Sequence, residues 1–251
     1  MVGLAQLAER LVVVQEVAGS TPVAHPTEIG SRAGFHKGRT GYPVRPFVFN
    51  RATALDEGNT EMTVLPVTIW GEPVLHRRAS EVEVFDDELR TLIADMFETN
   101  DAANGVGLAA PQIGVGKRLF VYKYANDDDV PEQGVVVNPV LTLSKVSGAL
   151  PDPDEHVEGC LSFPGEYYPL QRAEWTRVQG FDGDGNPLDF EATGWFARIL
   201  QHEFDHLDGK LYVNRLVDRY SKKALKQAKR NGWGVPGLTW MPGVDPDPFG
   251  H

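Results

Sequence analysis

One segment near the end of the chain, QHEFDHLDG (201–209), constrains the fold more than any other. His202 and His206 are four residues apart. Four residues turn an α-helix by about 400°, so a helix here projects both imidazoles from one face. Two imidazoles on one face can bind one metal ion, and Glu203, rotated to the side, can reach a water molecule at that ion. The segment predicts a helix whose histidine face points into a metal site completed elsewhere in the chain. A solvated surface helix is the alternative.

The third ligand decides the class of metal site. A metzincin would have a histidine six residues after His206, and that position is Tyr212. A thermolysin-like enzyme would use a later glutamate, and no glutamate follows Glu203. Asp208 or Asp218 could complete a site only in a rarer arrangement. Both common peptidase patterns therefore fail.

Cys160, in EGCLS (158–162), is the best remaining candidate for the third ligand. A thiolate is a strong ligand for borderline-soft divalent ions, and one cysteine with two histidines leaves a fourth position open, as a catalytic site requires. A buried core cysteine is the alternative. Because it is the only cysteine, no intramolecular disulfide can form, which favours a reducing cytosol.

A third segment with chemical potential is GVGLAAPQ (105–112). Gly105 and Gly107 permit close approach of another backbone, and the side chain of Gln112 can donate an N–H to a developing oxyanion. The alternative is a connecting loop in which the glycines only turn the chain.

Hydrophobic periodicity predicts a mixture of helices and strands without regular βαβ alternation. We expect helices over 86–103, 194–207 and 218–230, and strands over 118–124, 134–144, 176–182 and 188–192. This order favours an α+β fold with antiparallel sheets packed around the helix that carries His202 and His206. The Gly- and Pro-containing end, 232–251, is expected to be loose.

The net charge of -11 argues against wholesale binding to nucleic acid, so we expect no specific DNA partner. No stretch approaches the roughly 20 apolar residues of a membrane span. The apolar run at 11–14 is too short for a secretion signal. We therefore expect no membrane partner and a cytoplasmic protein.

Taken together, GVGLAAPQ, EGCLS and QHEFDH resemble the three motifs of the peptide deformylase family, in the family's order and approximate spacing. The resemblance runs from about residue 65 to about residue 216. It implies an α+β fold and hydrolysis of the N-formyl group from the first methionine of newly synthesised proteins, with release of formate. It also implies that Cys160, His202 and His206 hold one ion per chain, usually Fe²⁺, which Zn²⁺, Ni²⁺ or Co²⁺ can replace.

The resemblance assigns further roles by position. Glu203 would accept a proton from water and pass it to the leaving amine. The Gln112 side chain and the Leu161 backbone N–H would stabilise the oxyanion, and the backbone of 105–107 would pair with an extended peptide. Several residues would lie near the methionine pocket, with the head of Arg198 turned outward: Val106, Glu158, Trp195, Arg198 and Ile199.

These observations predict three parts of the chain: an extension over 1–61, a catalytic domain over 62–220, and a basic helix with a tail over 221–251. We expect the extension to be disordered or not translated, with Met62 as the start, because its irregular sequence cannot bury enough apolar area. The resemblance also implies docking on the ribosome through the C-terminal segment, so we expect the basic 218–230 helix to contact ribosomal RNA. A solvated basic face is the alternative.

Two other classes of protein remain open. A zinc peptidase would use His202 and His206 with an acidic third ligand. A non-catalytic metal-binding protein would carry a degenerate site, of which the sequence shows no sign.

Overall fold

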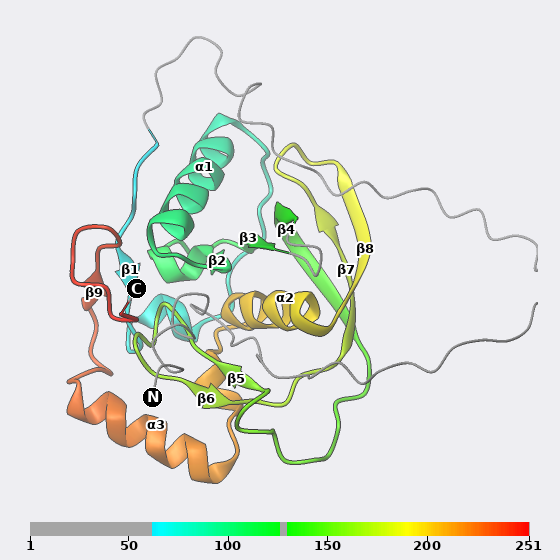
Figure 1. The fold of residues 1–251 in the computed structure, drawn as a ribbon. Helices are drawn as coiled ribbons and strands as arrows, with labels where there is room; N and C mark the ends of the chain where they lie inside the picture. Colours follow the sequence, from blue (N-terminus) through cyan, green and yellow to red (C-terminus); the bar gives the residue numbers. More distant parts are fainter. Residues whose placement is uncertain (1–61, 126–129, 251) are drawn as a thin grey trace, which may run out of the picture.

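The computed structural model describes residues 62–125 and 130–250 (Figure 1). At its centre is a five-stranded antiparallel sheet of order β2-β3-β4-β7-β8. Its strands are β2 (Gly107–Ala109), β3 (Leu119–Ala125), β4 (Pro131–Leu143), β7 (Trp175–Phe181) and β8 (Pro187–Thr193). The helices of this described part are α1 (Asp87–Ala102), α2 (Gly194–Leu207) and α3 (Asp218–Arg230).

Short elements join the remaining segments. Two antiparallel pairs are β1 (Val67–Thr68) with β9 (Thr239–Trp240), and β5 (Val157–Glu158) with β6 (Tyr168–Pro169). Single 3-10 turns cover Pro73–His76, Ala110–Ile113 and Tyr212–Arg215. β2, β5, β6 and β9 were not predicted from the sequence, because strands of two or three residues show no alternation of apolar and polar residues.

The part of the sheet formed by β3 and the middle of β4 is buried on both faces, which explains the continuous apolar runs at 119–122 and 135–137. Successive side chains of a strand point to opposite faces. Leu119, Val121, Val135 and Val137 share one core cluster with α1, whereas neighbours such as Phe120 share another with α2. The sheet thus lies between the two helices, and α2 occupies the middle of the molecule (Figure 1).

This architecture confirms the predicted α+β fold with antiparallel sheets around the central helix. The bounds of α2 and α3 agree with the predicted ranges of 194–207 and 218–230, and α1 begins one residue later than expected. Asp86 is the N-cap of α1, where its carboxylate accepts the backbone N–H of Leu89 at 3.0 Å.

The prediction of a loose C-terminal tail is wrong for the described residues up to 250. Trp240 and Phe249 are buried in the cluster that also contains Leu161, and β9 pairs with β1. Gly and Pro spacing suggested disorder, but two large aromatic side chains bury enough apolar area to hold the segment in place.

The boundary drawn between 220 and 221 falls inside α3. Tyr220, Ala224 and Ala228 form the buried stripe of this helix and pack in the same cluster as Cys160. The helix is therefore packed against the catalytic domain.

Across the described residues, no helix is both long and apolar enough to span a membrane. The extension predicted over 1–61 lies outside the residues that the structure describes.

Candidate active site

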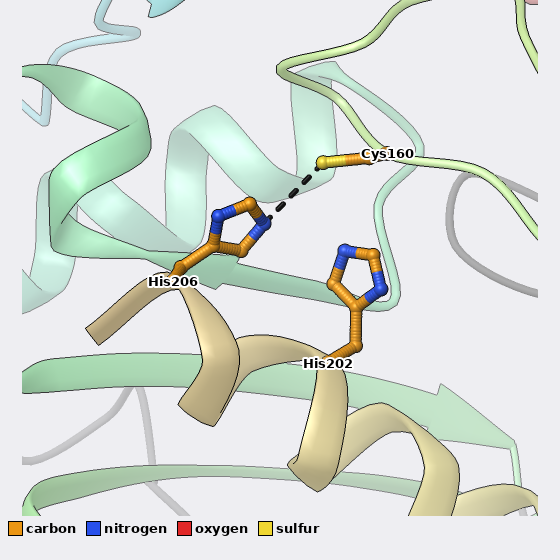
Figure 2. Close-up of side chains that lie close together, drawn as sticks. All are labelled: Cys160, His202 and His206. Carbon is orange, nitrogen blue, oxygen red and sulfur yellow. Dashed lines mark hydrogen bonds between the residues drawn. The ribbon is translucent and has the colours of Figure 1, made fainter. Parts of the chain in front are cut away.

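Three potential metal ligands from two distant segments meet beside α2 (Figure 2). Cys160 extends from the loop after β5 toward the histidine face of the helix. Its Sγ lies 3.3 Å from Nε2 of His206, and the ligand atoms of Cys160, His202 and His206 all lie within 4.8 Å of one another. All three side chains are buried. Helical spacing brings the two imidazoles together, and only the tertiary fold adds the thiol.

The donor set fits a divalent metal ion. Nε2 of His202 is buried without a hydrogen-bond partner among the described residues, as expected of an atom reserved for a ligand. Burial raises the pKa of the Cys160 thiol and lowers the pKa of His206. A bound cation reverses the first effect, because a coordinating thiol loses its proton. In the described chain this is the one group of its kind, and it contains neither Asp208 nor Asp218. Asp208 instead pairs with Arg118 at 2.9 Å.

A carboxylate orients His202. Nδ1 of His202 lies 3.0 Å from Oε2 of Glu158, which leaves Nε2 facing the other two ligands. Such carboxylate–histidine pairs hold the ring and its tautomer in the orientation that a metal requires. Glu158 is completely buried. Burial alone would raise its pKa, but the charge and hydrogen bonds of Arg172 outweigh that effect, and the net shift is downward.

Glu158 belongs to a buried ion-pair network that the sequence analysis missed. Arg172 donates to both oxygens of Glu158 at 2.8 Å and to Asp205 at 2.7 Å. Arg215 also pairs with Asp205, from the partly exposed end of the network. Arginine and aspartate usually lie at the surface, so nothing in the sequence marked Arg172 or Asp205 as interior residues.

Glu203 follows His202 on α2 and packs against β2. It is completely buried, and neither carboxylate oxygen has a hydrogen-bond partner among the described residues. Burial raises its pKa well above the usual range. A buried carboxylate beside a metal site is the kind of group that acts as a general base. A Cβ atom built on Gly107 would overlap Oε1 of Glu203. Gly107 is therefore needed for the close packing of β2 on the carboxylate.

Gln112 lies on the turn after β2, and the oxygen of its side-chain amide is fixed by a hydrogen bond. Its Oε1 accepts the backbone N–H of Ala109 at 2.7 Å, which fixes the amide so that Nε2 faces Cys160 Sγ at 3.8 Å. This donor points into the group of candidate ligands. The backbone of Leu161 is held by its carbonyl, which accepts the indole N–H of Trp240 at 3.0 Å.

The residues expected to pair with a peptide differ in their availability. Gly105 donates its N–H to the Asn100 carbonyl at 2.8 Å, and its own carbonyl accepts from Nδ2 of Asn100 at 2.7 Å. The N–H of Gly105 is therefore already used within the protein, and its carbonyl has one acceptor position left. The Val106 carbonyl accepts from Lys123 in β3. Adjacent residues of an antiparallel strand point their polar groups to opposite sides, so the N–H and carbonyl of Gly107 face away from β3.

The residues predicted near the methionine pocket lie in different surroundings. Val106 and Trp195 are partly buried and share a small apolar cluster with Tyr167, which the sequence analysis did not identify. Ile199 is fully buried in the core between α2 and the sheet. The head of Arg198 turns inward, contrary to expectation, and donates to Glu158 at 2.9 Å and to the Leu170 carbonyl at 2.7 Å. The oxygens of Glu158 are likewise bonded to protein groups, so its contacts indicate an orienting role.

Comparison with known proteins identifies the family. The family model of polypeptide deformylase matches residues 64–222. A peptide deformylase of Mycolicibacterium smegmatis is 58% identical over 197 residues, which span 76% of this chain and 100% of that protein.

Solved structures similar to this chain support the same family. The peptide deformylase of Thermus thermophilus is 41% identical with a TM-score of 0.58, covering 66% of this chain and 94% of its own. A peptide deformylase of Acinetobacter baumannii bound to Met-Ala-Ser is 35% identical with a TM-score of 0.54, covering 62% of this chain and 100% of its own. The matched region contains all three segments that build the site, and the chain belongs to the peptide deformylase family.

Proposed function

We propose that Cys160, His202 and His206 hold the metal ion of this enzyme and that Glu203 transfers the protons of its reaction. As a member of its family, the protein is a metal-dependent hydrolase that removes the N-formyl group from the first methionine of new polypeptides. The observation that carries the assignment is the buried Glu203 carboxylate, which lacks a partner among the described residues beside three converging ligand atoms.

The residues divide the reaction between them. When bound, the metal supplies Lewis-acid polarisation and lowers the pKa of water. Glu203 takes the proton of the attacking water and returns it to the leaving amine, so that formate and a free methionine amine result. Gln112 Nε2 and the Leu161 N–H donate to the oxygen on which negative charge develops.

The substrate is proposed to bind as an extended strand along the free edge of β2. Gly107 presents its backbone groups there, and backbone pairing does not depend on the side chains that follow the methionine. Val106 and Trp195 would contact the methionine side chain, because they line the same apolar cluster beside this edge. Binding of Met-Ala-Ser by the Acinetobacter relative supports a short, methionine-headed ligand.

We propose Fe²⁺ as the native ion. Thiolate and imidazole ligands would suit Zn²⁺ equally well, so the choice follows from the family and not from ligand softness. Metal analysis of protein purified without oxygen tests it: about one iron per chain is expected. Zinc as the bound metal in protein taken directly from cells would contradict the proposal.

Formate release from formyl-Met-Ala tests the catalytic assignment. Glu203→Gln keeps the shape of the side chain but removes the proton acceptor, so kcat should fall by about 10²–10⁴ while the metal stays bound. Glu88→Gln, on the exposed side of α1, is the matched control and should retain full activity. Near-normal turnover of Glu203→Gln with one metal bound would rule out this role. The zinc-peptidase alternative fails on the family match, and Cys160→Ala should lose the metal.

The basic face of α3 is proposed to dock on ribosomal RNA in the cytoplasm. Its five basic residues are all exposed: Arg219, Lys222, Lys223, Lys226 and Arg230. On a protein of net charge -11 this face can bind phosphates that the rest of the surface repels.

Charge reversal tests the docking. Changing Lys222, Lys223 and Lys226 to Glu should weaken co-sedimentation with ribosomes and leave hydrolysis of formyl-Met-Ala unchanged. The matched control reverses three exposed lysines outside α3, namely Lys117, Lys145 and Lys210. Equal co-sedimentation of both triple variants would remove the idea. We further propose that translation starts at Met62 and that 62–250 form one catalytic unit, which intact-mass analysis of the endogenous protein would test.

A further inference from the structure

Asn100, in the last turn of α1, is a buried polar residue that the proposed reaction does not use. Its side chain has no exposed surface. Its backbone carbonyl accepts the Gly105 N–H at 2.8 Å, and its side-chain Nδ2 donates to the Gly105 carbonyl at 2.7 Å. Oδ1 has no hydrogen-bond partner among the described residues. The residue therefore holds both polar groups of one peptide position and little else.

We infer that Asn100 is a positioning residue for substrate binding, which clamps Gly105 and so sets where the edge of β2 lies relative to Glu203. This inference rests on the proposed pairing of the peptide along β2. Gly105 lies two residues before Gly107, whose backbone groups face the open edge. A shift of Gly105 is transmitted directly to that edge, because only Val106 intervenes.

The hydrogen bonds of Asn100 to Gly105 act next to a part of β2 that has little room to move. Gly107 packs so closely on the Glu203 carboxylate that even one added methyl group would overlap it. On the other side, the Val106 carbonyl accepts from the Lys123 N–H at 3.0 Å, and the Lys123 ammonium pairs with Asp101 at 2.7 Å. The end of α1 is thus joined to the chain around β2 and β3 at neighbouring positions, because Asn100 bonds Gly105 and Asp101 pairs with Lys123.

The same contact explains the first glycine of GVGLAAPQ. A Cβ atom on Gly105 would overlap Oδ1 of Asn100. Gly105 has no positive φ, so its backbone conformation alone would accept another residue. The buried amide of Asn100 is therefore sufficient to require glycine at this position.

Three variants test the inference in the metal-loaded full chain. Asn100→Ala removes the side-chain bond, and Asn100→Asp replaces the donor with an oxygen that faces the Gly105 carbonyl. Thr99→Val is the matched control: Thr99 is equally buried, and its hydroxyl bonds Leu65 and Asp95 without touching Gly105. The readouts are kcat, KM and metal content with formyl-Met-Ala and formyl-Met-Ala-Ser.

We expect both Asn100 variants to raise KM for formyl-Met-Ala-Ser by roughly 10- to 100-fold, since a small displacement of a positioning segment weakens every contact along it. The rise should be smaller for formyl-Met-Ala, which makes fewer backbone contacts, and kcat and metal content should stay near those of the unmodified protein. Thr99→Val should leave KM unchanged. An unchanged KM, or a loss of kcat at constant KM for both peptides, would overturn the inference and indicate a role in folding alone.

A double variant gives a second, independent readout. Gly105→Ala should be damaging beside Asn100, because the new methyl group meets Oδ1. In the Asn100→Ala background the overlap disappears, so Gly105→Ala should cost little more than Asn100→Ala alone. Additive losses would contradict the clamp. Failure here is distinguishable from failure of the catalytic assignment, which Glu203→Gln tests through kcat.

Discussion

Replacing Arg172 with methionine should destabilise the protein far more than the same change at the surface. Arg172 makes three short charge-assisted bonds, two to Glu158 and one to Asp205, and the three side chains are 5%, 0% and 3% exposed. Removing one partner of such a pair leaves buried charge uncompensated and costs about 3–5 kcal/mol. Arg198 remains on Glu158 and Arg215 on Asp205, so we expect the lower end, about 3 kcal/mol.

Arg177 provides the matched control. It also makes a two-bond contact with a carboxylate, at 2.7 and 2.6 Å to Asp189, but both side chains are 45% exposed. Water screens this pair, so Arg177→Met should cost far less stability than Arg172→Met. The two variants differ mainly in burial, which isolates the effect under test.

Urea unfolding followed by circular dichroism, with the metal held at a fixed concentration, measures both variants. A loss of about 3 kcal/mol corresponds to a fall in Tm of about 6–12 °C for a domain of this size. Arg172→Met should also bind metal about 10-fold more weakly, because Glu158 no longer holds His202 as firmly. If Arg172→Met costs no more than Arg177→Met, the reasoning from burial is refuted.

Four further predictions follow from the same contacts. Gly107→Ala should reduce kcat by about 10²-fold, because its methyl group displaces the Glu203 carboxylate, and an unchanged kcat would contradict this packing. Trp240→Phe keeps the ring but loses the bond to the Leu161 carbonyl, so kcat should fall by roughly 5-fold with metal content unchanged. The pKa of Glu158 is lowered in the folded protein, so its contribution to stability is present above its unfolded pKa, about 4.5, and is lost as pH falls below that value. In urea unfolding of metal-free protein, Glu158→Gln should therefore lose less stability than the unmodified protein between roughly pH 5 and pH 3. Finally, iron-loaded protein should lose activity in air while nickel-loaded protein retains it, since Fe²⁺ and the Cys160 thiolate are open to oxidation, and equal decay of the two forms would argue against it.

The sequence predicted best those features that depend on neighbouring residues. The 3.6-residue period of α2 and α3 and the apolar runs of β3 and β4 are local signals, and the structure reproduces them closely. The spacing of His202 and His206 belongs to the same class, because a helix alone decides that both rings share a face.

Elements whose formation depends on distant partners were missed. The two residues of β9 form a strand only because β1 lies beside them, and Trp240 is buried only because the Leu161 loop provides a surface. From its sequence alone, a Gly- and Pro-containing segment is predicted to be loose, because the distant surface that it packs against leaves no local signal. Likewise, Asn100 reads as an ordinary polar residue at the end of a helix.

The sequence by itself determined the chemistry available to this protein: two histidines one helical turn apart, a glutamate between them, one cysteine and one glutamine in glycine-containing segments. Tertiary structure decided which of these groups meet and what surrounds them. It brought the Cys160 thiol to 3.3 Å from His206, buried Arg172 between two carboxylates, and turned the head of Arg198 inward. The physical reason is that ligand type and helical period are properties of residues and their neighbours, whereas burial and pairing depend on which segments the folded chain places side by side.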